Sequence, residues 1–183
     1  LLALCQRGLE AFGLDRSPAL LARAGELEGG LLRGRLVRGD FRALPFRERS
    51  FGGVVMLFSS FGYFDDADNA RVLAECARVL EPGGRLATVI WASLPENPWF
   101  DAPREAVTAV LGEERASFAR VFGKLGDPDE AADVHRAAGL EDVGARRLRE
   151  QLRRADAGEH WDLLCRENGH FRRVDADLGE DKR

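Results

Sequence analysis

The sequence has few cysteines and no long apolar run, and both absences narrow the class of protein. No apolar run approaches the ~20 residues that a membrane-spanning helix needs, and no basic start with a small-residue cleavage site marks a signal peptide. Cys5, Cys76 and Cys165 lie far apart and lack the paired spacing of a zinc site or a disulfide framework. We therefore expect idle thiols in a reducing cytoplasm, with no metal and no membrane partner.

Lysine is also scarce, and neither sign of charge dominates. Lys124 and Lys182 are the only lysines among 27 basic residues, and the arginines are scattered. The formal net charge of −4 comes without a long basic block, which argues against a general nucleic-acid-binding surface. A length of 183 residues with 45% hydrophobic content fits one ordinary globular domain.

The stretch from Phe51 to Phe64 is the feature around which the rest of the chain is arranged. Val54 to Phe58 is a short, unbroken apolar run with β-branched residues, typical of a strand buried on both faces in a parallel sheet. Small, polar and aromatic residues follow it directly. This pattern predicts an aromatic-lined loop at the carboxyl end of a strand, where open α/β sheets bind their ligands.

Strand and helix patterns alternate over most of the chain. Strands are expected over 9–14, 35–38 and 85–91, with 141–148 as a last candidate. Helices are expected after the N-cap Ser17, from about 69 to 80 behind the carboxylates of 65–68, after Asn97, after Asp127, and over 159–165. This alternation predicts an α/β fold with a doubly wound parallel sheet and helices on both faces.

Two carboxylates stand where expected strands end. Asp15 follows the first strand and precedes a helix, a position from which a carboxylate accepts hydrogen bonds from both ribose hydroxyls of a nucleotide. Asp40 follows the next strand beside Phe41, where a carboxylate accepts from an exocyclic amine and the ring packs on a base. Each carboxylate alone also fits a simple turn. With the loop after Val54–Phe58, however, three consecutive strand ends carry ligand-type chemistry.

In order and spacing, these pieces resemble the class I S-adenosylmethionine-dependent methyltransferases of small molecules. The resemblance lies in FGLDRSPALLARA, VRGDFRALPFRERSFGGVVMLFSSFGYF and RVLAECARVLEPGGRLATVIW, and it covers residues 1–91 closely and the AAGLEDV run near Gly139 more loosely. It implies a Rossmann-like, three-layer α/β/α fold. It also implies S-adenosylmethionine as cofactor and a small-molecule methyl acceptor as partner, with the oligomeric state left open.

The resemblance assigns roles to individual residues. Asp15 would bind the ribose, Arg16 would flank the adenine, Asp40 would accept from its amine, and Phe41 would supply a backbone N–H. The methionine end of the cofactor would be lined by Phe58, Ser59 and Ser60. The residues that would face the methyl group or shape the acceptor pocket are Phe61, Tyr63, Trp91 and Trp99. Core packing for the Phe61 and Tyr63 rings, and a lid for the two tryptophans, remain alternatives.

The family's glycine-rich loop and first strand should precede Leu1, and its antiparallel last strand has no good candidate before Arg183. We interpret the chain as a fragment of a longer protein, inactive by itself if the loop is essential. The missing first strand would leave the strands that end at Asp15 and Phe58 without their shared neighbour. The expected division is a truncated methyltransferase domain over 1–150 and a helical or irregular segment of the same domain over 151–183.

Methyl transfer needs little covalent help from protein, because the methyl carbon of a sulfonium is already electrophilic and positioning supplies much of the rate. A site of aromatic and small polar groups without a strong base agrees with this chemistry, so no catalytic residue is assigned. A nicotinamide-dependent oxidoreductase also carries an acid after the second strand. A non-catalytic binding module is a third interpretation. His135, His160 and His170 lack partners for a metal site or a triad, and we expect them to be exposed to solvent.

Overall fold

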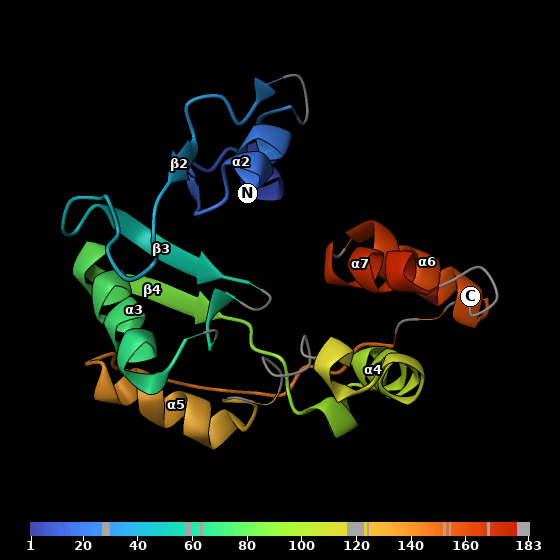
Figure 1. Ribbon diagram of the computed structural model, residues 1–183. Helices are drawn as coiled ribbons and strands as arrows, with labels where there is room; N and C mark the ends of the chain where they lie inside the picture. Colours follow the sequence, from blue (N-terminus) through green and yellow to red (C-terminus); the bar gives the residue numbers. More distant parts are fainter. Residues whose placement is uncertain are drawn as a thin grey trace. The chain divides into compact units, whose positions relative to one another are not determined.

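The computed structural model describes residues 1–26, 30–57, 60–62, 64–116, 123, 125–151, 153, 155–167 and 169–178, without the side chains of Glu167 and His170. The chain divides into two compact units. Unit 1 comprises Leu1–Met56, Phe64–Thr88 and Ala137–Glu141, and unit 2 comprises Leu57–Tyr63, Val89–Arg136 and Asp142–Arg183. Figure 1 shows the helices and strands of both units.

The first part of unit 1 is a small parallel sheet. After the short helix α1 (Leu2–Gln6), β1 (Gly13–Asp15) pairs in parallel with β2 (Leu36–Arg38). Helix α2 (Pro18–Gly25) connects them, and Ser17 caps it as expected, its Oγ accepting a hydrogen bond from the N–H of Leu20 at 3.3 Å. The register places Asp15 opposite Arg38, so the carboxyl ends of the two strands lie side by side.

A second parallel pair, β3 (Phe51–Met56) with β4 (Leu80–Thr88), completes unit 1 together with helix α3 (Asp66–Val79). Asp65 caps this helix by accepting a hydrogen bond from the N–H of Asp68 at 2.8 Å. The pairing shifts register inside β4: Leu80 lies opposite Phe51, but Arg85 lies opposite Gly53. Residues 81–84 therefore form an irregular insertion between the two paired parts of β4.

Helix α3 packs on β4 through the apolar stripe that the sequence predicted, which includes Val72, Leu73 and Cys76 (Figure 1). Burial raises the pKa of the Cys76 thiol to about 11. The expectation that the central strand is buried on both faces is wrong for the described residues, since Met56 is 6% exposed but Val55 is 52% exposed. Side chains alternate across a strand, so Val55 and Met56 lie on opposite faces, and only the Met56 side is buried at this end of the strand.

The α/β fold class and the parallel pairing are confirmed. Strands β1 and β3 belong to separate two-stranded sheets, in agreement with the expectation that they are not direct neighbours. The candidate strand over 141–148 is wrong, because this segment has no strand partner in the described chain and Leu148 is 65% exposed. The boundary expected near residue 150 is not tested by these observations.

The extended connector Leu44-Pro45-Phe46 is tied to α3 by two charged side chains. Glu75 accepts a hydrogen bond from the N–H of Leu44 at 2.7 Å. Arg78 donates to the carbonyl oxygens of Leu44 and Phe46 at 2.9 and 3.0 Å, and its guanidinium also lowers the pKa of Glu75. Because the connector begins just after Asp40, these bonds hold the end of the loop that follows β2.

Unit 2 is mainly helical. Its elements are the 3-10 turn η3 (Leu94–Glu96) and the helices α4 (Pro98–Leu111), α5 (Pro128–Ala137), α6 (Ala157–Glu167) and α7 (Gly169–Asp177). Val107, Ala116 and Val174 form a buried cluster, and Trp161 packs against it. The indole N–H of Trp161 donates to Asp175 at 2.9 Å, which joins α6 to α7. Helices α4, α5 and α6 agree with the helices predicted from the sequence, whereas α7 was not predicted.

Two histidines differ from expectation. His135 is buried, because its Nδ1 lies 2.7 Å from the carbonyl oxygen of Ala131 and its ring packs edge-on against Phe61. His160 is partly buried, with its Nε2 2.9 Å from the carbonyl oxygen of Trp99. The prediction of solvent exposure is therefore wrong for both His135 and His160, and the side chain of His170 lies outside the described residues.

Within the described chain, no helix combines the length and the apolar character that crossing a membrane requires.

Candidate cofactor-binding site

Asp15 and Asp40 lie at neighbouring strand ends. Asp15 is the last residue of β1, and its carbonyl oxygen accepts a hydrogen bond from the N–H of Gly39 at 3.1 Å. Asp40 follows Gly39 directly, and its Oδ2 lies 3.7 Å from Nε of Arg16, the residue after Asp15. The expected closeness of these two strand ends is thus confirmed, while the binding roles of their side chains stay predictions.

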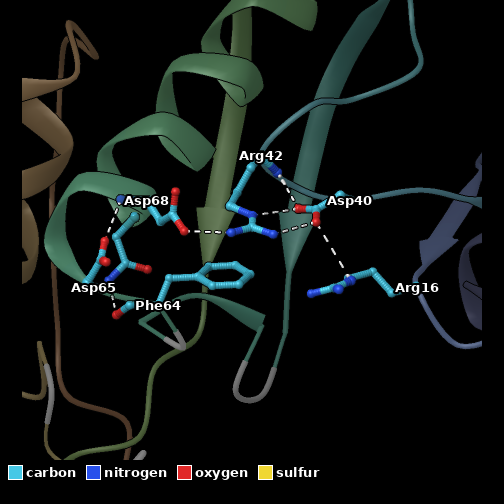
Figure 2. Close-up of polar contacts among 7 residues, drawn as sticks. Arg16, Asp40, Arg42, Phe64, Asp65 and Asp68 are labelled. Atoms are coloured by element: carbon cyan, nitrogen blue, oxygen red, sulfur yellow. Dashed lines mark hydrogen bonds and ion pairs between the residues drawn. The ribbon is translucent and has the colours of Figure 1, made fainter.

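Arg42 binds Asp40 through both carboxylate oxygens. Its Nε donates to Oδ1 at 3.0 Å and its second terminal nitrogen donates to Oδ2 at 2.8 Å, while its backbone N–H also donates to Oδ1 at 3.0 Å. The remaining terminal nitrogen donates to Asp68 in the first turn of α3 at 2.6 Å. Figure 2 shows the guanidinium between the two carboxylates and over the ring of Phe64, 4.7 Å from the ring centroid.

The charges around Asp40 keep it ionised. Hydrogen bonds from the Arg42 side chain, with a further one from its backbone N–H, hold the pKa of Asp40 well below its usual range. The same contact with Asp40, followed by the contact with Asp68, raises the pKa of Arg42. Asp40 is therefore a fixed acceptor of hydrogen bonds at neutral pH.

Replacing Asp40 with asparagine is expected to lower the free energy of unfolding near neutral pH and to have less effect in acid. Because the folded-state pKa of Asp40 is lowered, the ion pair stabilises the fold fully above the ordinary value of about 3.9, and this stabilisation is lost as the pH falls below it. Urea unfolding should give a difference between wild type and variant that is constant above about pH 5 and shrinks below about pH 4. For Arg42→Gln, the difference in the free energy of unfolding from wild type should shrink in acid in the same way. A difference of equal size at neutral and at acid pH would contradict a stabilising ion pair between Asp40 and Arg42.

The remaining predicted cofactor residues are only partly described. Phe41 is half-buried in the turn that begins at Asp40. Ser60 belongs to unit 2, and its hydroxyl donates to the carbonyl oxygen of Leu57 at 2.8 Å. Phe58, Ser59 and Tyr63 lie outside the described residues. The structure therefore brings together the proposed ribose and adenine residues in unit 1.

The predicted acceptor residues that are described all pack within unit 2. Phe61 is 3% exposed against His135, which is the core packing that the sequence left open. Trp91 packs edge-on against Phe100, and Trp99 packs against His160 with ring centroids 4.0 Å apart. These contacts anchor the side chains, and their role toward a methyl acceptor stays a prediction.

Arg42 was not predicted as a site residue, and Asp68 was predicted only as a helix cap. The capping oxygen comes from Asp65, whereas the Asp68 side chain binds Arg42 across 26 residues of sequence. The spacing Asp40-x-Arg42 was a usable local signal, because an arginine two residues after a carboxylate reaches it within one turn. The contact with Asp68 depends on tertiary structure.

Comparison with known proteins identifies the class of this chain. A family model described as a methyltransferase domain matches residues 1–84. A demethylmenaquinone methyltransferase of Thermotoga maritima is 43% identical over 89 residues, covering 49% of this chain and 35% of the relative. Another, from Corynebacterium kroppenstedtii, is 31% identical over 157 residues, covering 77% of this chain and 67% of the relative. A solved structure from Thermotoga maritima, described as an S-adenosylmethionine-dependent methyltransferase and possible histamine N-methyltransferase, is 25% identical with a TM-score of 0.43, over 71% of this chain and 55% of that chain.

The chain is a methyltransferase-type α/β protein and belongs to the class I S-adenosylmethionine-dependent methyltransferase family. The parallel strands β1 to β4 are accordingly part of a Rossmann-like fold, as the sequence resemblance implied. The chain spans 35% of the Thermotoga relative's length and 67% of the Corynebacterium relative's length. None of these relatives supports the nicotinamide alternative.

Proposed function

We propose that the protein transfers a methyl group from S-adenosylmethionine to a small-molecule acceptor. The observation that carries this proposal is the position of Asp15 and Asp40 at the adjoining carboxyl ends of two parallel strands, connected through Arg16. Ligands of open α/β sheets bind at this edge. Family membership supports the sulfonium cofactor over a nicotinamide.

The described side chains fit a nucleoside. The contact of Asp15 with Ser17 uses Oδ1 at 2.7 Å, and in the described chain this carboxylate has no other side-chain partner, so lone pairs are left for a vicinal diol. Asp40 is held ionised and suits an exocyclic amine, and the half-buried Phe41 stands beside it. Ribose and adenine offer these groups.

The cofactor supplies an electrophilic methyl carbon, so the chain's own residues act by binding and orientation. Asp15 and Asp40 would fix the nucleoside end. Phe58, Ser59 and Ser60 would line the methionine end, and Phe61, Tyr63, Trp91 and Trp99 would shape the acceptor side. No side chain is assigned as a base, and oxygen, nitrogen and carbon remain possible nucleophiles.

Relatives named as demethylmenaquinone methyltransferases make a quinone-type small molecule the first acceptor to test. We place the reaction in the cytoplasm, which Cys5 and Cys76 support because neither forms a disulfide, and reducing compartments keep thiols in that state.

Calorimetric titration of the full-length protein with S-adenosylhomocysteine tests the proposal. We expect saturable binding in the micromolar range, roughly the affinity typical of enzyme ligands, and no comparable binding of NADH. Transfer of label from methyl-labelled S-adenosylmethionine to a demethylmenaquinone analogue then tests the acceptor. Absence of any binding at high micromolar protein would overturn the methyltransferase proposal, whereas binding without transfer to the quinone would overturn only this acceptor.

A further inference from the structure

Arg42 has an unusual number of fixed contacts for a loop residue. Three of its nitrogens donate to Asp40, one donates to Asp68, and its guanidinium lies over the ring of Phe64. Phe64 is itself held, because its carbonyl oxygen accepts a hydrogen bond from the buried Asn69 at 3.0 Å. Figure 2 shows Arg42 connecting the loop after β2 to the first turn of α3.

The two carboxylate oxygens of Asp40 accept different numbers of hydrogen bonds. Oδ1 accepts the backbone N–H and the Nε–H of Arg42, and these two bonds use both of its lone pairs. Oδ2 accepts one bond from Arg42, and its other near neighbour is Arg16 at 3.7 Å, beyond hydrogen-bond distance. One acceptor position therefore remains, on Oδ2 and on the side of Arg16.

The two arginines around Asp40 differ in how firmly they are held. The Arg42 side chain is 31% exposed, and its guanidinium is bound to Asp40 on one side and to Asp68 on the other, whereas the Arg16 side chain is 61% exposed. A ligand amine that approaches Oδ2 would therefore displace Arg16 and leave Arg42 in place.

We propose that Arg42 is a positioning residue that fixes Asp40 so that a single oxygen, Oδ2, reads the amine of the bound nucleoside. This inference rests on the proposed function, because it takes an aminopurine as the ligand. Arg42 does not itself contact the ligand; its fork orients Asp40 and excludes other acceptor geometries. Asp68 and Phe64 keep the fork in place from the side of α3.

The test compares two probes in the full-length protein: S-adenosylhomocysteine and its inosine counterpart, in which a carbonyl oxygen replaces the amine. A carboxylate acceptor should favour the amine by roughly 100-fold or more in the wild type, because the carbonyl leaves Oδ2 facing another acceptor. Arg42→Gln should weaken binding of the adenosine probe about tenfold or more. The protein's preference for the adenosine probe over the inosine probe should fall by a similar factor. A loss of protein stability would weaken the binding of both probes equally, so it would leave the ratio of the two affinities unchanged.

Arg42→Lys separates geometry from charge, because lysine keeps the positive charge but cannot form the fork. We expect it to behave like Arg42→Gln, and wild-type preference in the lysine variant would overturn the inference. Asp68→Asn, which releases the other end of Arg42, should lower the preference by a smaller factor. It also provides a readout if Arg42→Gln does not fold, and an unchanged preference in Asp68→Asn and Arg42→Lys would likewise overturn the proposal.

Arg104→Gln is the matched control, since Arg104 in α4 pairs with Asp101 through two nitrogens at similar exposure. It should leave both affinities unchanged. If the wild type binds neither probe, the proposed function fails and this inference fails with it. If the wild type prefers the amine but the Arg42 variants do as well, only the role of Arg42 is refuted.

Discussion

Replacing Asp15 with asparagine is expected to weaken binding of S-adenosylhomocysteine to the full-length protein by roughly 100-fold, because hydrogen bonds to a charged acceptor contribute about 1.5–3 kcal/mol. Asparagine keeps an oxygen for the N–H of Ser17, which Oδ1 of Asp15 accepts at 2.7 Å, so the start of α2 should be retained. The substitution removes the charge that two ribose hydroxyls would share. Calorimetric titration measures the change directly.

Asp127→Asn is the control for this experiment. Asp127 precedes α5 as Asp15 precedes α2, and its Oδ1 accepts from the N–H two residues further along at 2.9 Å. The control should bind the probe like the wild type. Wild-type affinity in Asp15→Asn would remove Asp15 from the site and leave Asp40 as its only supported acidic residue.

Replacing Leu73 with alanine is expected to lower the free energy of unfolding of unit 1 by about 3 kcal/mol, the usual cost of a cavity left by a buried leucine. Leu73 is 0% exposed and lies on the buried face of α3, the helix that packs on β4. Urea unfolding should be followed by far-UV circular dichroism. The three tryptophans lie in unit 2, so their fluorescence reports on the other unit.

Leu20→Ala in α2 provides the comparison, because Leu20 is 56% exposed and its loss should change the free energy of unfolding by no more than about 0.5 kcal/mol. Equal effects of the two substitutions would mean that α3 is not the core helix of unit 1. An unchanged fluorescence transition in Leu73→Ala would show that the two units unfold independently.

Local chemistry in the sequence was sufficient to predict much of unit 1. Ser17 and Asp65 marked the starts of α2 and α3 because their side chains satisfy backbone N–H groups within the same turn. The apolar stripe of α3, with Val72, Leu73 and Cys76, followed from helical spacing alone. Asp15 and Asp40 were placed at adjoining strand ends because parallel strands align their carboxyl ends.

Long-range contacts were beyond such patterns. The exposure of Val55 depends on whether a second layer covers that face, and the burial of His135 depends on Phe61, more than 70 residues earlier in the sequence. The apolar character of 141–148 did not make a strand, because a strand needs a partner to satisfy its backbone hydrogen bonds.

The sequence by itself thus determined the α/β class and the two acidic strand ends, since these follow from short-range periodicity and from residue types at turns. The family came from the resemblance of three sequence runs to known methyltransferases. The tertiary structure alone decided that Arg42, the neighbour of Asp40, also contacts Asp68 and Phe64, since these two residues meet the loop after β2 only when α3 packs beside it.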